Sequence, residues 1–128
     1  MQILIEVSPG ELIDKLTILE IKLEHISDPE KLSNVSREYE TLTISRRRTI
    51  PDTPEIVRLT EELKRVNLQL WNIEDDIRVH ERDSDFGEDF VTLARSVYRT
   101  NDGRATIKRR INDLLKSAIV EEKSYSAY

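Results

Sequence analysis

The sequence predicts an all-α protein in which helical hairpins form a bundle around one long central helix. Glycine occurs only 3 times in 128 residues and charged residues make up 35% of the chain, a composition that favours helices. Apolar residues recur three and four positions apart along most of the chain, which is the period of one helix face. A serine, aspartate or threonine directly followed by proline occurs three times, and each is a typical helix start.

The first predicted helix spans Pro9 to about Ile26. Ser8 can accept a hydrogen bond from the Glu11 amide, and Glu11 can reach back to the Ser8 amide, which together make a capping box. Pro9 takes the first helical position, where its missing N–H costs nothing. One helix face then carries Leu12, Leu16, Leu19, Leu23 and Ile26. Additional isoleucines widen this face, so we expect the helix to contact more than one neighbour.

The segment before this helix, Gln2 to Val7, predicts a short N-terminal β-strand. Ile3, Ile5 and Val7 lie on one side of an extended chain, which is the period of a strand. A single strand needs a partner for its backbone groups. The C-terminal tail and the same strand of a second subunit are both open as partners.

A second helix is predicted from Pro29 to about Leu42, because Asp28 and Pro29 repeat the cap-and-proline signal. Only two residues join it to the first helix, which predicts an αα-hairpin or a sharp kink. The next segment, residues 43–53, is basic, rich in β-branched residues and contains a proline. We therefore expect a flexible loop there.

The central helix is predicted over about residues 54–82, with Thr53 as its cap. Its apolar residues follow a sustained heptad, typical of a coiled coil: Ile56, Leu59, Leu63, Val66, Leu70, Ile73 and Ile77. At 1.5 Å per residue the rod is roughly 43 Å long. Either the first two helices lie antiparallel along it, or it meets its own copy in a dimer.

Asp83 to Gly87 interrupts the pattern, and a fourth helix is predicted from there to about Thr100. A fifth helix is predicted from Arg104 to about Ala118. The Asn-Asp-Gly sequence between them favours a turn or a cap. A continuous helix through this sequence remains an open alternative.

Four stretches are characteristic: SPGELIDKLTILEIKLEHISDPEKLSNV, LWNIEDDIR, LARSVYRTNDGRATIKRRIN and VEEKSY. Together they resemble a family of small bacterial proteins, about 130 residues long, known only as a domain of unknown function. The resemblance covers almost the whole chain. It implies one stand-alone domain, residues 1–128, and it implies no activity, substrate or catalytic residue.

Composition excludes several classes of function. The chain has no cysteine, so it forms no disulfide, thiolate zinc site or cysteine nucleophile. No apolar run approaches the ~20 residues of a membrane span, and the N-terminus lacks the features of a signal peptide. We expect a cytoplasmic protein without membrane contact. Aromatic residues are 5% of the chain and its net charge is -5, which argues against nucleic acid as a partner.

The charge is unevenly distributed along the chain. Residues 95–128 hold eight basic and four acidic residues, a net charge of +4, which leaves -9 for residues 1–94. The two parts can pair within one chain or between two subunits. We expect a homodimer, because the apolar surface of the first and third helices exceeds what their neighbours can cover.

Charged residues on the apolar first and third helices form a candidate polar cluster: Asp14, Lys15, Glu20, Glu74 and Asp75. Such charges are either paired in salt bridges, which is the favoured interpretation, or part of a polar pocket. Acidic members of a pocket supply the oxygen ligands that Mg²⁺ prefers. His25 and His80 each lack a second histidine at ligand spacing, so no zinc site is expected.

A second candidate set follows along the chain and is basic: Arg95, Arg99, Arg104 and Lys108. Two arginines one turn apart, followed by a helix start near Gly103, can bind a phosphate or a carboxylate. The favoured interpretation is again structural, with Arg95 and Arg99 paired to the acidic helices.

The function that the sequence favours is a non-enzymatic, dimeric interaction or scaffold module without a cofactor, whose protein partner is not identified. The alternative is a small-ligand enzyme or binder, with an Mg²⁺-dependent nucleotide or phosphate-ester site between the first, third and fourth helices. Whether the protein is an enzyme is left open. Convergence of the two candidate sets on one cleft favours the alternative, whereas scattered or paired charges favour the interaction module.

Overall fold

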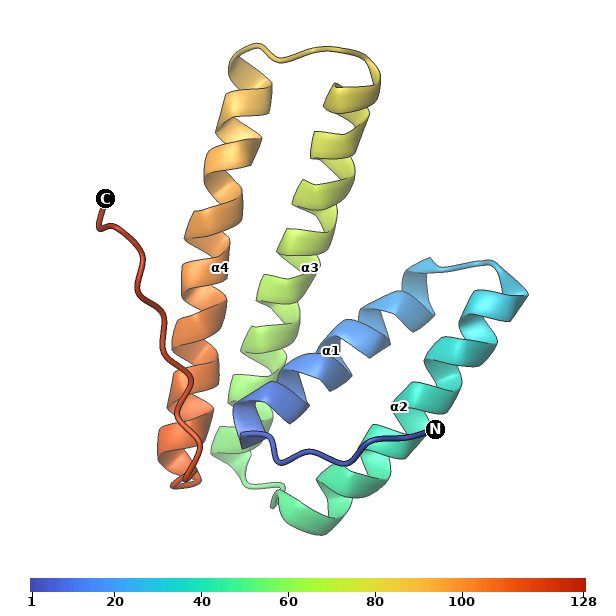
Figure 1. Ribbon diagram of the computed structural model, residues 1–128, viewed down its shortest axis with the longest axis vertical. Coiled ribbons are helices and arrows are strands. Elements are labelled where there is room, and N and C mark those ends of the chain that lie inside the picture. Colours follow the sequence, from blue (N-terminus) through green and yellow to red (C-terminus); the bar gives the residue numbers. More distant parts are fainter.

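The computed structural model describes residues 1–128 and contains four α-helices and no β-strand (Figure 1). α1 (Pro9–His25) and α2 (Pro29–Thr49) form a short antiparallel hairpin, and α3 (Pro54–Arg82) and α4 (Glu88–Leu114) form a longer one. The two hairpins meet at an angle, with α1 between them. α1 packs against all three other helices, whereas α2 packs against α1 alone. None of the helices is both long and apolar enough to cross a membrane.

The first three helices begin where the sequence predicts. Ser8, Asp28 and Thr53 each accept a hydrogen bond from the backbone amide three positions further on, at 2.9–3.2 Å. The proline after each cap takes the first helical position. The reciprocal half of the predicted capping box at the first helix is wrong, because the Glu11 carboxylate binds Lys108 instead.

The predicted loop at residues 43–53 is wrong over most of its length, since α2 continues to Thr49. The Arg46 guanidinium holds the end of the helix by donating to the Ile50 carbonyl at 3.2 Å and pairing with Asp52 at 2.8 Å. The Ile50 side chain is buried in the core. Tertiary anchoring at this end therefore outweighs the low helix propensity of the β-branched residues before it.

The fourth and fifth predicted helices are one helix, α4, which runs through the Asn-Asp-Gly sequence. Gly103 meets no neighbouring atom within 4 Å of where a Cβ would stand, so nothing forces a turn there. Ile107 and Ile111 anchor the following turns in the core. The helix ends at Leu114, and two residues later Lys116 has a φ of 52°, in the left-handed region. The Ser117 amide then donates to the Asn112 carbonyl at 2.9 Å, as in a Schellman motif.

The predicted N-terminal strand is not formed. Residues 1–7 lie along the surface without strand structure, and their backbone groups make no backbone hydrogen bond. The side chains of Ile3 and Leu4 are 77% and 98% exposed. The C-terminal tail, which was one of the two open partners for this strand, leaves the segment unpaired.

The hydrophobic core lies where α1 crosses the lower halves of α3 and α4. It consists of Leu12, Ile13, Leu16, Ile50, Ile56, Leu59, Leu63, Ile107 and Ile111. By contrast, no side chain between residues 68 and 106 is fully buried. Residues 70–100 of this stretch, the distal parts of α3 and α4 with their loop, project beyond the crossing with α1 (Figure 1); we call them the two-helix arm.

Candidate functional site

A buried polar cluster lies where α1 crosses α3 and α4, and consists of Asp14, Thr17, Asn67 and Arg104. Asp14 is 1% exposed, and the Arg104 guanidinium donates to both of its carboxylate oxygens, with Nε at 2.9 Å from Oδ1. The Asn67 amide donates to Asp14 Oδ1 at 2.8 Å and to Thr17 Oγ1 at 2.9 Å. The Thr17 hydroxyl donates to the Asp14 carbonyl at 2.8 Å. We call this group the junction cluster.

Asp14 and Arg104 form the ion pair at the centre of the junction cluster. The hydrogen bond to Asp14 raises the pKa of Arg104, against the opposing effect of burial. Two parallel N–H to oxygen bonds are the strong, orienting geometry of an arginine–carboxylate pair. Because the polar groups of the cluster are partners of one another, the cluster fixes the crossing of α1 with α3 and α4.

The first turn of α1 docks directly against α4. The Gly10 amide, one of the free N–H groups at the helix start, donates to Asn112 Oδ1 at 2.7 Å. A Cβ at Gly10 would stand only 2.6 Å from the Lys108 carbonyl oxygen. The absence of a side chain at Gly10 therefore allows this close approach. Asn112 accepts the hydrogen bond of the Gly10 amide, which is buried from water.

Lys108 links the same helix start to the C-terminal tail. Its ammonium group lies 2.7 Å from Glu11 Oε2 and 3.1 Å from Glu121 Oε2. Burial lowers the pKa of Lys108, but the hydrogen bonds to the two carboxylates outweigh it and the net shift is upward. Ser8 Oγ also donates to Glu121 at 2.6 Å, and this bond is the main reason that the pKa of Glu121 lies below its ordinary value.

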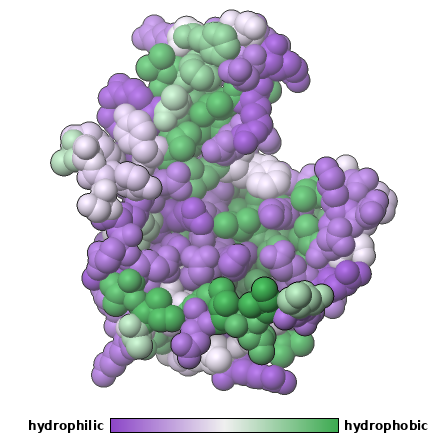
Figure 2. All heavy atoms as spheres, viewed as in Figure 1, coloured by the Kyte–Doolittle hydropathy of each residue, from purple (hydrophilic) through white to green (hydrophobic).

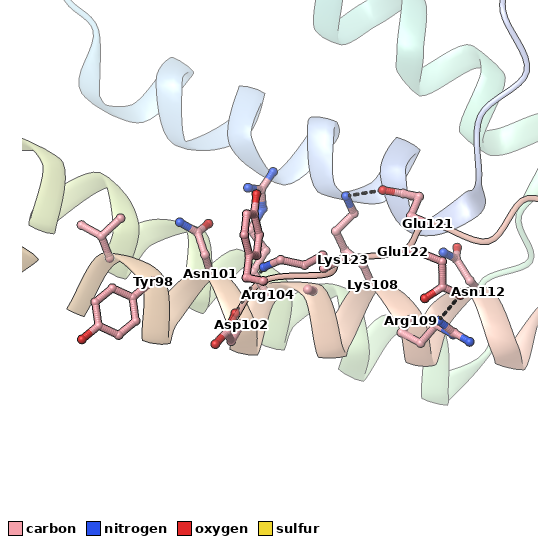
Figure 3. Close-up of a pocket in the computed structure, with 13 residues that line it drawn as sticks. Tyr98, Asn101, Asp102, Arg104, Lys108, Arg109, Asn112, Glu121, Glu122 and Lys123 are labelled. Atoms are coloured by element: carbon pink, nitrogen blue, oxygen red, sulfur yellow. Dashed lines mark hydrogen bonds and ion pairs between the residues drawn. The ribbon is translucent and has the colours of Figure 1, made fainter. Parts of the chain in front are cut away.

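An open pocket of about 460 Å³ lies between α4 and the tail (Figure 3). Its basic lining residues are Arg104, Lys108, Arg109 and Lys123. All four are paired with carboxylates: Arg109 lies 3.5 Å from Glu122, and Lys123 lies 3.2 Å from Asp102. Dashed lines in Figure 3 mark the pairs of Lys108 with Glu121 and of Arg109 with Glu122, between α4 and the tail. The pocket is polar, but its charges hold the tail against the helix.

The structure does not bring the candidate polar cluster together. Asp14 is in the junction cluster, whereas Lys15 is exposed beside the N-terminal segment. Glu20 pairs with Lys64 at 3.2 Å. The other two members of the cluster, Glu74 and Asp75, lie on the arm, where the Glu74 carboxylate pairs with Arg78 one turn away.

The basic candidate set divides into two pairs. Arg104 and Lys108 lie at the helix crossing, paired with acidic side chains of α1. Arg95 and Arg99 lie on the arm, away from the junction cluster. The predicted pairing of Arg95 and Arg99 with the acidic helices is wrong, since neither forms an ion pair, and the basic residues that pair with α1 are Arg104 and Lys108.

Several residues at this crossing were absent from the predicted sets, among them Thr17, Asn67, Asn112 and Glu121. Asn112 directly follows the apolar Ile111 and lies one turn from Lys108. A polar residue at this position, close to the apolar side of the helix, was the available sign of a buried hydrogen bond. Glu121 follows the last helix, and no helical period relates it to Ser8. Only the path of the tail brings these two side chains together.

No three histidine, aspartate or glutamate side chains gather at a geometry that holds a metal ion. His25 packs against Trp71 with ring centroids 5.5 Å apart, and His80 lies 3.2 Å from Asp85. The Mg²⁺ site of the alternative function stays a prediction.

Comparisons with known proteins give a family and no activity. No curated protein matches the chain, and no solved structure matches it. A family model covers residues 3–128, almost the full length, and its description is a family of unknown function (DUF6165). The chain therefore belongs to this family of unknown function, as the four characteristic sequence stretches suggested.

Proposed function

We propose that the protein is a non-enzymatic interaction module that forms a homodimer through the two-helix arm. The observation that carries the proposal is that no arm side chain is fully buried, although the arm has a continuous apolar seam. The seam consists of the half-buried residues Leu70, Ile73, Ile77, Phe90, Leu93 and Val97. Figure 2 shows apolar atoms along the arm, flanked by polar ones.

Two helices alone cover such a seam from one side only, because a stable layered structure needs a second layer. Val79 on α3 and Val91 and Tyr98 on α4 add exposed apolar surface to the arm outside the seam. A second arm, related by a twofold axis, supplies the missing layer and makes a four-helix bundle. The heptad of α3 is the pattern that such a bundle requires.

Charge on the arm is complementary between two copies. Ion pairs within the arm use Glu74 with Arg78, and the residues of the loop at its tip. Among the charges left without an ion pair are Asp75 and Asp76 on α3, and Arg95 and Arg99 on α4; Glu81 on α3 and Glu88 and Asp89 at the start of α4 are further unpaired acids. In a twofold pairing that places α3 of one copy beside α4 of the other, the two aspartates of each copy attract the two arginines of its partner.

The first test replaces Val79 by glutamate, with Val57→Glu as the matched control. Both valines are 43% exposed and both lie on α3, but only Val79 lies on the arm. We expect a dimer for the wild type in sedimentation equilibrium. Val79→Glu should raise the dissociation constant about a hundredfold, because each copy buries a charge against the other. Val57→Glu should leave it unchanged. A monomeric wild type at micromolar concentration contradicts the proposal.

A second set of variants tests the orientation of the pairing. Reversing the two arginines (Arg95→Glu with Arg99→Glu) should weaken the dimer, as should reversing the two aspartates (Asp75→Arg with Asp76→Arg). A mixture of the two variants should form a heterodimer, because both of its α3–α4 contacts again join opposite charges. The chain that carries all four changes should recover the homodimer, and failure of this recovery contradicts the proposed orientation.

The small-ligand alternative is favoured by one observation only, the polar pocket between α4 and the tail. An anionic ligand there has to displace carboxylates from Arg104, Lys108, Arg109 or Lys123, since each of these cations is already paired. The interaction module requires no such exchange, and it is therefore the function that we propose.

A further inference from the structure

The second large concave surface of the molecule is a groove between the N-terminal segment, residues 2–7, and the outer side of α2. Its volume is about 790 Å³, within the range of sites that bind ligands or peptide side chains. Half of its apolar lining belongs to the N-terminal segment itself, and the other half is supplied by the body of the protein, at Leu12, Leu42, Ile50 and Leu115. Figure 2 shows a band of apolar atoms across the lower part of the molecule, where Figure 1 places the N-terminal segment.

The backbone beside this groove is free. Residues 2–7 alternate as a strand does, but none of their backbone groups takes part in a backbone hydrogen bond. The side chains of Ile3, Leu4 and Ile5 are all exposed. An extended segment with free N–H and C=O groups is a template for a further strand, and adding a strand to such an edge is a common mode of peptide recognition.

The charged residues at the groove favour an acidic peptide segment. The ionisable residues that line it are Lys15, Arg37 and Glu38, so cations outnumber acids. Lys15 is exposed on α1 and Arg37 is exposed on α2, and neither is among the chain's ion pairs. An incoming segment gains most if its apolar side chains fill the groove and an acidic side chain reaches these two cations.

We propose that the groove binds an extended, apolar peptide segment with acidic residues, from a partner protein, which adds as a strand beside residues 2–7. The proposal deepens the interaction function by naming the chemistry of a partner. It does not require the dimer, because the groove lies on the α1–α2 hairpin and not on the arm. The two proposals can therefore fail separately.

The test measures fluorescence anisotropy of a labelled hexapeptide of alternating valine and glutamate, with the full-length protein. A peptide of alternating valine and lysine is the charge control. We expect saturable binding of the acidic peptide and about tenfold weaker binding of the basic one. Arg37→Glu should reverse this preference, whereas Arg47→Glu, an exposed change on the same helix outside the groove, should leave it unchanged. Equal binding of both peptides overturns the proposal.

A proline series tests strand addition itself. Successive amides of a strand point to opposite sides, so only alternate residues donate to one neighbouring strand. Leu4→Pro and Ile5→Pro each remove one amide donor, and Leu4→Ala and Ile5→Ala remove the same side chains but keep the donor. One proline should weaken peptide binding about fivefold more than its alanine control, the effect of one lost hydrogen bond, and the other should match its control. Equal effects of both prolines overturn the proposal.

Two further measurements show whether a partner peptide or a second copy of the chain binds in the groove. Val79→Glu should bind the peptide as tightly as the wild type, because the arm is not involved. The first seven residues of the chain also have a strand-like pattern of side chains and include an acidic residue, Glu6. A second copy of the protein could therefore place this segment in the groove, and a labelled peptide of that sequence tests for it. If it binds the protein more tightly than the valine–glutamate hexapeptide, the groove is a seat for a second copy and the partner proposal is overturned.

Discussion

Gly10 shows how a single missing side chain sets the position of a helix. The first turn of α1 touches α4 at this residue, and a Cβ there would lie 2.6 Å from a backbone oxygen and 2.8 Å from the Asn112 amide oxygen. Gly103 is the contrasting case, in the middle of α4 with open space around it. The same substitution therefore has opposite consequences at the two positions.

We predict that Gly10→Ala lowers the free energy of unfolding by about 2 kcal/mol, because the two helices must separate to admit the methyl group. Gly103→Ala should raise it by about 1 kcal/mol, since alanine is the better helix former and meets no neighbour. Urea denaturation of both variants measures the difference. A Gly10→Ala variant as stable as Gly103→Ala contradicts the close approach of α1 and α4.

Asp14 is the residue whose charge the fold depends on. Its carboxylate is buried and its oxygens accept from both Arg104 and Asn67. We predict that Asp14→Leu lowers the free energy of unfolding by about 3 kcal/mol, because it leaves a partly buried guanidinium without its counter-charge. The double variant with Arg104→Met should be the more stable of the two in urea denaturation, as apolar replacement of a whole pair is better tolerated. Additive losses contradict a direct pair.

At the scale of the element, the C-terminal tail is held to the body by charge and not by apolar burial. Residues 119–128 are all exposed, yet Glu121, Glu122 and Lys123 each pair with a residue of α4. Tyr128 adds a hydrogen bond to Asp102, which together with Lys123 lowers the pKa of Asp102. Docking of the tail should therefore respond to pH.

We predict that the tail detaches in acid. The pKa values of Glu121 and Asp102 lie below their ordinary values of 4.5 and 3.8 in the folded state. Their contribution is complete above those ordinary values and is lost as the pH falls through the lowered pKa values. Lys108 has a raised pKa, so its contribution is complete below 10.5 and is lost only as the pH rises through the raised value.

The measurement is the heteronuclear NOE of the tail amides across a pH titration. The values should stay high at neutral pH and fall below about pH 4, while the core amides keep theirs. Glu121→Gln should weaken docking at neutral pH and reduce the acid transition. A tail whose order does not change with pH down to the unfolding of the core contradicts the ionic attachment.

Helix starts were predictable at this scale and helix ends were not. Ser8, Asp28 and Thr53 carry their cap signal within four residues of sequence, so a local pattern is sufficient. The end of α2 depends on the distant core around Ile50, and the continuity of α4 depends on the packing of Ile107 and Ile111. Non-local contacts override propensity at both places, which is why the predicted loop at residues 43–53 was wrong over most of its length and why the sequence left open whether the helix continues through Gly103.

At the scale of the whole molecule, two hairpins of unequal length produce the surfaces on which both proposals rest. α1 and α2 are too short to cover the length of α3 and α4, so the arm extends beyond the core (Figure 1). α2 packs on α1 alone, so its outer side stays free to form the groove. The apolar surface that one copy leaves uncovered is the reason to expect a partner.

The sequence by itself determined the helical class, three helix starts, the length of α3 and the family, because periodicity, caps and characteristic stretches are local properties of the chain. Only the tertiary structure decided which charges meet. Asp14, Arg104 and Glu121 are far apart in sequence and their side chains carry no mark of their partners, so their pairing follows from the crossing of α1 with α4 and the path of the tail. The tertiary structure also decided which basic residues of α4 are paired. Folding places Arg104 and Lys108 beside α1, and it leaves Arg95 and Arg99 on the arm, where no second layer covers them.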